Sequence, residues 1–147
     1  RCLPLLERTG RDFLASCRML KRVDLSPLSH LVYIGPCFLQ GCGSLTSIDL
    51  RNLCNVEHID DYFLEGCTSL TSVDLSGLRN CRWIGESFLA NSGVTAVRFQ
   101  MPSCRRIGVF MLSGCRALRE VCFAGLTSIV RIDGCPAADV MRSYRLP

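Results

Sequence analysis

The sequence predicts a repeat solenoid, built mainly of parallel β-structure with short helical turns between its coils. A 25-residue motif recurs along the chain, and its units begin at Phe13, Phe38, Phe63, Phe88 and Met111. The spacings are 25, 25, 25 and 23 residues, and each unit carries nine apolar positions of which only Ser92 departs across all five units. One such unit cannot bury nine apolar side chains alone, whereas stacked units share a continuous core.

The repeat also sets the predicted domain organisation. The 147 residues are 48% hydrophobic and 20% charged, which favours a packed chain over a disordered one. No apolar run approaches the ~18 residues of a membrane helix. The predicted repeats are 13–37, 38–62, 63–87, 88–110 and 111–135. Residues 1–12 are predicted to be the tail of a preceding repeat or an N-terminal edge, and residues 136–147 a C-terminal tail or cap, so we expect a piece of a longer array.

The second unit gives the local structure expected in each coil. Residues 45–50 (Leu-Thr-Ser-Ile-Asp-Leu) alternate apolar and polar side chains at their end, which predicts a strand. Residues 56–59 offer a second extended segment, and residues 60–66 read as one helical turn that begins near Asp and ends at Gly. The fourth unit has lost two residues and its Gly-Cys pair, so we expect a bend or loop there.

The repeated core resembles the BspA-like, or Treponema-type, leucine-rich repeat. The resemblance rests on Cys-x-x-Leu-x-x-Ile-x-Leu at Cys42 to Leu50, its counterpart at Cys67 to Leu75, and Ile-Gly-x-x-Phe at Ile84 to Phe88. The unit is longer than is usual in that family, and Phe-Leu replaces its common Ala-Phe. The resemblance implies a leucine-rich-repeat solenoid that acts in protein binding or adhesion, without enzymatic activity or cofactors, and it allows a cell-surface location.

The eleven cysteines favour buried thiols over chemistry. Six fall in apolar columns: Cys17, Cys42, Cys67 and Cys115 in one, Cys81 and Cys104 in another. Side chains in a column point in parallel, which disfavours disulfides, and no pair has a zinc spacing, so we expect no metal site. Their odd number and the lack of an Asn-x-Ser/Thr acceptor favour an intracellular chain.

Two outward columns are candidate binding sites. The first lies on the predicted strand face, where Asp24, Asp49 and Asp74 repeat and need a compensating cation, basic peptide, water or hydroxyl groups. Its candidate residues are Lys21, Arg22, Asp24, Asp49, Asp74 and Arg98. The second column lies on the second extended segment, and its aromatic and arginine side chains have the composition of binding hot spots. Its residues are Tyr33, His58, Trp83, Arg106 and Arg131. This column can also be a self-satisfied ladder.

These features favour a non-catalytic module that displays a face to a protein partner. Only His30 and His58 could serve as a catalytic base, and neither stands beside a nucleophile in the repeat register. A structural spacer within a longer repeat protein is one alternative. Adhesion to a glycan or anionic polymer is another, because residues 75–147 carry ten basic side chains against four acidic ones. The scattered basic residues do not favour nucleic acid.

Overall fold

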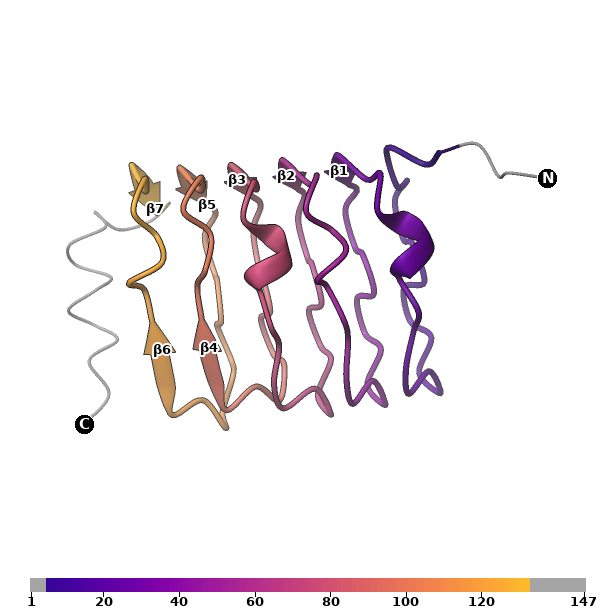
Figure 1. Cartoon of the computed structure of the whole chain (residues 1–147). Coiled ribbons are helices and arrows are strands. Elements are labelled where there is room, and N and C mark those ends of the chain that lie inside the picture. Colours follow the sequence, from indigo (N-terminus) through magenta and orange to yellow (C-terminus); the bar gives the residue numbers. More distant parts are fainter. Residues whose placement is uncertain (1–4, 133–147) are drawn as a thin grey trace.

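The structure, a computed structural model, describes residues 5–132 as one row of stacked coils (Figure 1). One edge of every coil contributes a strand to a five-stranded parallel sheet, here called the long sheet, in the order β1-β2-β3-β5-β7. Its strands are β1 (Tyr33–Ile34), β2 (His58–Ile59), β3 (Trp83–Ile84), β5 (Arg106–Ile107) and β7 (Arg131–Ile132). The predicted C-terminal tail or cap and the end of the fifth repeat lie outside the described residues, as do the side chains of β7.

A second parallel sheet, the short sheet, pairs β4 (Ala96–Arg98) with β6 (Glu120–Cys122). Two 3-10 helices, η1 (Ser26–Leu28) and η2 (Ser76–Leu78), follow the corresponding region along the first and third coils. The stacked parallel coils confirm the predicted solenoid. No helix in the part of the chain that the structure describes is long and apolar enough to cross a membrane.

The register of the long sheet follows the repeat. Tyr33 pairs with His58, His58 with Trp83, and Trp83 with Arg106, so each residue faces its equivalent one coil away. An additional bridge joins Arg8 to Tyr33 and extends the ladder by one coil toward the N-terminus. Residues one place later along each strand point into the core, since Ile34, Ile59, Ile84 and Ile107 are all buried.

The apolar columns form the continuous core that the repeat predicts. Phe13, Phe38, Phe63 and Phe88 stack in nearly parallel pairs, with ring centroids 5.1 to 5.5 Å apart. The last three rings are fully buried. Because the near-parallel rings repeat at coil spacing, the stack fixes the separation and alignment of the coils that carry the long sheet.

The predicted helical turn at residues 60–66 is wrong. Tyr62, Leu64 and Gly66 have positive φ angles of 64°, 55° and 71°, which no right-handed helix contains. Their N–H groups bond to neighbouring coils instead: Tyr62 to the Glu86 carbonyl at 2.8 Å and Leu64 to the Phe38 carbonyl at 3.0 Å. A helix this short is weak by itself, so hydrogen bonding between coils outcompetes it.

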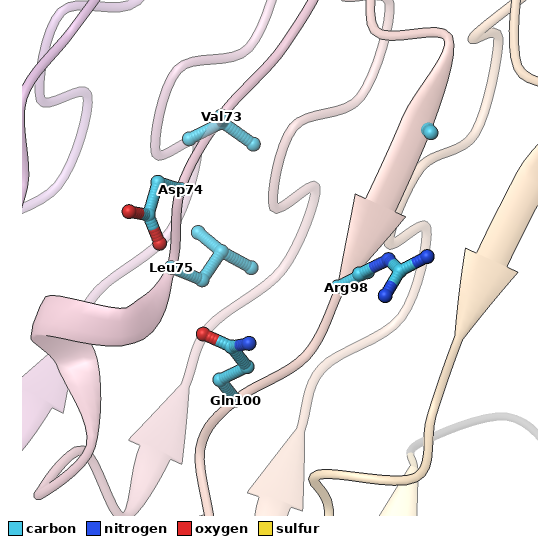
Figure 2. Close-up of a pocket in the computed structure, with 6 residues that line it drawn as sticks. Val73, Asp74, Leu75, Arg98 and Gln100 are labelled. Carbon is cyan, nitrogen blue, oxygen red and sulfur yellow. The ribbon is translucent and has the colours of Figure 1, made fainter.

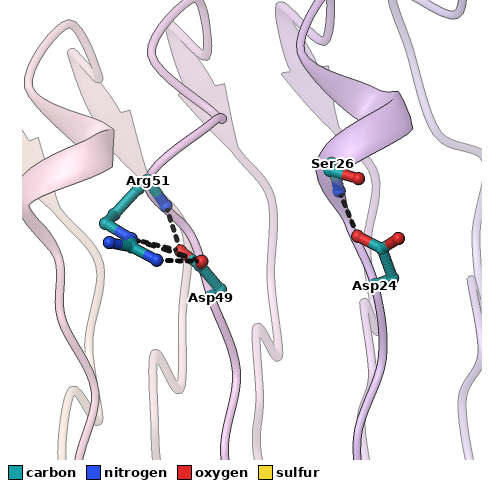
Figure 3. A network of polar contacts seen from close by, with 4 residues as sticks. All are labelled: Asp24, Ser26, Asp49 and Arg51. Atoms are coloured by element: carbon teal, nitrogen blue, oxygen red, sulfur yellow. Dashed lines mark hydrogen bonds and ion pairs between the residues drawn. The ribbon is translucent and has the colours of Figure 1, made fainter.

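The predicted strand at residues 45–50 is also wrong for the first coils, because among residues 5–132 strands form in this column only at β4 and β6, with an isolated bridge from Ser72 to Ala96. In the first three coils, the aspartate carboxylate accepts a hydrogen bond from the N–H two residues later, as Asp24 does from Ser26 at 2.9 Å (Figure 3). Such local bonds compete with strand pairing. Arg98 and Cys122 replace the aspartate in the last two coils, and there the strands pair directly.

The fourth unit, where we expect a bend or loop, has turn and irregular backbone over residues 86–95 but stays in register with the neighbouring coils. Leu89 N–H bonds to the Phe63 carbonyl at 2.9 Å, so the ladder between coils crosses this unit without interruption. Asn91 takes the left-handed position of the lost glycine with a φ of 53°, a conformation that asparagine tolerates better than most residues. Next to the deletion the backbone of Gly93 lies so close to the preceding coil that a Cβ at this position would collide with the Thr68 carbonyl oxygen.

Candidate protein-binding surface

A row of stacked polar and aromatic side chains runs along the outer face of the long sheet. We call it the ladder surface, and it consists of Arg8, Tyr33, His58, Trp83 and Arg106. The Tyr33 and His58 rings lie 5.1 Å apart, and the His58 and Trp83 rings 6.2 Å apart. Guanidinium groups cover both ends, with Arg8 4.1 Å from the centre of the Tyr33 ring and Arg106 5.9 Å from that of Trp83.

The stack leaves its central residue, Trp83, substantially open to solvent. Both faces of Trp83 are covered by ladder neighbours, yet 49% of the residue remains exposed. Tyr33 is half-buried, and its hydroxyl donates a hydrogen bond to the Asp60 carboxylate. That bond raises the pKa of Tyr33 above its usual value, because the phenolic proton is held by an anion. Ring stacking and this hydrogen bond therefore hold the side chains of the ladder surface in place.

A trough of about 240 Å³ lies on one side of Trp83, with Ile84, Gly85 and Gly108 among its lining. The trough is lined by three carboxylates, those of Asp60, Asp61 and Glu86. The Asp60 carboxylate accepts hydrogen bonds from the Tyr33 hydroxyl and from the N–H of Asp61, the latter at 2.9 Å. One carboxylate oxygen of Asp61 accepts the Glu86 N–H at 2.8 Å. The Glu86 side chain is exposed.

The opposite side of Trp83 carries mixed charge. Glu57, His58, Arg82 and Trp83 line a second depression of about 350 Å³. Arg82 lies 4.0 Å from Glu57, an exposed ion pair that contributes little to stability. The exposed Arg105 continues this flank in the next coil. The ladder surface thus separates an acidic flank from a mixed flank with excess arginine.

The predicted strand face is exposed but largely self-compensated. Side chains of all six candidates there lie open to solvent. The carboxylates of the three aspartates accept hydrogen bonds from residues two places later in the chain. Hydrogen bonds from Arg51 lower the pKa of Asp49 to about 2 (Figure 3). Hydrogen bonds from Ser26 and Ser76 likewise lower the pKa values of Asp24 and Asp74. The fourth coil adds an ion pair between Arg98 and Glu120, 3.5 Å apart.

One groove interrupts the strand face between the third and fourth coils. Its volume is about 270 Å³, and Figure 2 shows Asp74 and Arg98 on opposite sides of Val73 and Leu75. The Asp74 carboxylate accepts the Ser76 N–H at 2.9 Å, and Arg98 reaches toward the fifth coil. This groove offers one residue of each charge above an apolar floor.

The cysteine columns are structural within the described residues. All nine described cysteines are free, and Cys42, Cys67, Cys81 and Cys104 are fully buried. Cys17 and Cys115 are only half-buried, because they stand in the first and fifth coils. Burial raises the pKa of Cys67 and Cys81 to about 12, which makes these thiols unreactive.

The hydrogen bonding of Cys115, in the same column as Cys17, explains why a serine can stand in this column at Ser92. The Cys115 thiol donates to the Leu89 carbonyl at 3.0 Å, and the Ser92 hydroxyl donates to the same oxygen at 2.7 Å. Ser92 therefore keeps a polar hydrogen at a cysteine position although it breaks the apolar pattern. Among residues 5–132, no three His, Cys, Asp or Glu side chains converge as metal ligands would.

Stacked parallel coils with columns of buried leucine define a leucine-rich-repeat solenoid. Residues 6–119 match the family described as "BspA type Leucine rich repeat region (6 copies)", and the chain belongs to this family. No curated protein matches the chain. Among solved structures, the chain is similar to the functional domain of InlJ from Listeria monocytogenes, which includes a cysteine ladder. That similarity has a TM-score of 0.32 and 16% identity, and covers 72% of this chain and 23% of that one.

The structure brings together four of the five residues of the second predicted column. Tyr33, His58, Trp83 and Arg106 are in direct register, while only the backbone of Arg131 is described. Sequence reasoning missed Arg8, although it precedes Tyr33 by the repeat length of 25. It also missed the trough carboxylates, whose signal was Asp60 standing in a column that is otherwise glycine, at Gly35, Gly85 and Gly108, with Asp61 and Glu86 sharing the next column.

Proposed function

We propose that this chain is a non-catalytic protein-interaction module that binds a protein partner through the ladder surface. The observation that carries the proposal is Trp83, half-exposed at the centre of a rigid sheet with a depression on either side. Tryptophan, tyrosine and arginine dominate binding hot spots, and this surface presents all three. Their stacked rings are already ordered, so binding costs little side-chain entropy.

Membership of the BspA-type leucine-rich repeat family supports a module for protein interaction or adhesion. Leucine-rich repeats are generally non-catalytic, and His58 is stacked between two rings rather than placed beside a nucleophile. The strand-face groove between Asp74 and Arg98 is the second candidate surface. Adhesion to an anionic polymer is less favoured, because Arg51, Arg82 and Arg98 each face a carboxylate.

The test is quantitative affinity capture from the source cells with the parent chain, Trp83→Ala and Arg98→Ala. Arg98 is a matched exposed residue on the other face. We expect at least one protein to be recovered by the parent and by Arg98→Ala but lost with Trp83→Ala. Loss only with Arg98→Ala would assign binding to the strand face, and equal recovery by all three folded chains would favour the structural spacer.

A further inference from the structure

We infer that the trough beside Trp83 receives a basic side chain, arginine or lysine, from the protein that the module binds. This inference rests on the proposed function and names the chemistry of the partner. It follows from the shape of the trough, its unbalanced charge and the apolar ring edge beside it.

The shape comes from missing side chains. Gly85 and Gly108 line the trough where the neighbouring columns carry side chains. A Cβ at Gly85 would lie 2.7 Å from the backbone of Asp60, so close coil packing excludes a larger residue. The trough is therefore fixed by the stacking of the coils, and its volume of about 240 Å³ suits one long side chain.

The charge of the trough is not balanced within the described chain. Three carboxylates line it against the single guanidinium of Arg106, which lies over Trp83. None of the ion pairs found among residues 5–132 involves Asp60, Asp61 or Glu86. Carboxylates of both surfaces accept backbone hydrogen bonds, but only the strand-face aspartate column includes one, Asp49, with an arginine partner.

The two rim carboxylates are available to a ligand. Tyr33 and a backbone N–H occupy both oxygens of Asp60, which makes this residue part of the wall. Asp61 uses one oxygen for the Glu86 N–H, which orients its carboxylate and leaves the second oxygen for a partner. Glu86 is exposed one coil further on, so a guanidinium or ammonium group can meet both carboxylates at once.

The Trp83 edge suits the rest of such a side chain. Arginine and lysine carry an aliphatic stem that packs on apolar surface while the charged group reaches polar partners. An acidic ligand would meet three like charges, and a flat sugar ring would compete with His58 and Arg106 for the faces of Trp83. A basic side chain is therefore the occupant that fits both the ring edge and the carboxylates.

The test measures binding of fluorescein-labelled peptides by anisotropy at low and at physiological salt. One peptide alternates arginine with glycine, a second replaces arginine with neutral citrulline, and a third with glutamate. The protein variants are Asp61→Asn/Glu86→Gln, which removes the trough charge, and Asp12→Asn/Glu65→Gln, a matched control that removes the same charge from residues outside both candidate surfaces. Circular dichroism checks that each variant is folded.

We expect the parent and the control to bind the arginine peptide, and the trough variant to bind it about fivefold more weakly or worse, as for the loss of two exposed ion pairs. Citrulline should weaken binding to the parent similarly, and added salt should do so as well. Equal binding by both variants, or of the arginine and citrulline peptides, overturns the inference. Preference for the glutamate peptide also overturns it and assigns binding to the arginine flank.

Affinity capture separates this inference from the proposed function. If Trp83→Ala loses a captured protein that Asp61→Asn/Glu86→Gln retains, the interaction module stands and the basic-side-chain inference fails. If no captured protein depends on Trp83, the proposed function itself fails. Loss of the same protein with both variants supports both.

Discussion

Replacing Phe63 by alanine tests whether the phenylalanine stack holds the coils together. The Phe63 ring is fully buried, with its centroid 5.5 Å from that of Phe38 and 5.2 Å from that of Phe88. Truncation of a buried phenylalanine costs about 3–5 kcal/mol of unfolding free energy, and each lost aromatic pair adds about 0.5–1.5 kcal/mol. We expect a loss of about 4 kcal/mol or more, a large part of the about 5–15 kcal/mol typical of a folded domain.

Urea denaturation followed by circular dichroism measures this loss. With a denaturant slope of about 2 kcal/mol per molar, the urea midpoint of Phe63→Ala should fall by about 2 M. Trp83→Ala is the matched control, because it removes a stacked ring from the exposed ladder surface instead of the core, and its midpoint should change little. A drop below about 0.5 M for Phe63→Ala, or equal drops for both variants, would refute the reasoning that the buried stack carries the packing energy.

Two further stability predictions follow from the coil geometry and the buried thiols. Gly93→Ala should lower the melting temperature clearly, because its Cβ would collide with a carbonyl of the preceding coil. Gly43→Ala is the control and should leave the melting temperature unchanged, because the nearest atom to its Cβ would be 3.5 Å away. Equal melting temperatures of the two variants would contradict this prediction. Burial raises the pKa values of three thiols above the ordinary 9.0, to about 12, 12 and 11 in Cys67, Cys81 and Cys104. Above pH 9 the unfolded thiols therefore release protons that the folded thiols keep, so the free energy of unfolding should fall as the pH rises toward 11. Urea midpoints across this range check the slope, which should be shallower in Cys81→Ala; identical slopes would show that this thiol is not responsible.

The repeat columns made the fold predictable, because a column of like residues reports stacking directly. Ile34, Ile59 and Ile84 are buried in register, as the 25-residue spacing indicates. The local backbone between the columns was not predictable from pattern alone. Residues 60–66 have the residue types of a helical turn, but N–H groups of neighbouring coils decide their conformation.

The candidate site was predictable only in part, for a related reason. Spacing placed His58 beside Trp83, but it could not show that the rings stack face to face and expose their edges. The aspartate column was also a candidate binding site in the sequence. Sequence alone does not distinguish a carboxylate that accepts a hydrogen bond from a nearby backbone N–H, as Asp24 does, from one that accepts none. The trough also depends on which neighbours pair with Asp60 and Asp61, and those partners come from other coils.

Hydroxyl-radical footprinting of the chain with its captured partner would test the central claim, binding through the ladder surface, most directly. Trp83, 49% exposed, and Met19, 85% exposed and distant from Trp83 in the repeat register, are both readily oxidised side chains. We predict that the bound partner protects Trp83 and His58 from oxidation while Met19 reacts as in the free chain. Unchanged oxidation of Trp83 in the complex, with protection elsewhere, would contradict the account.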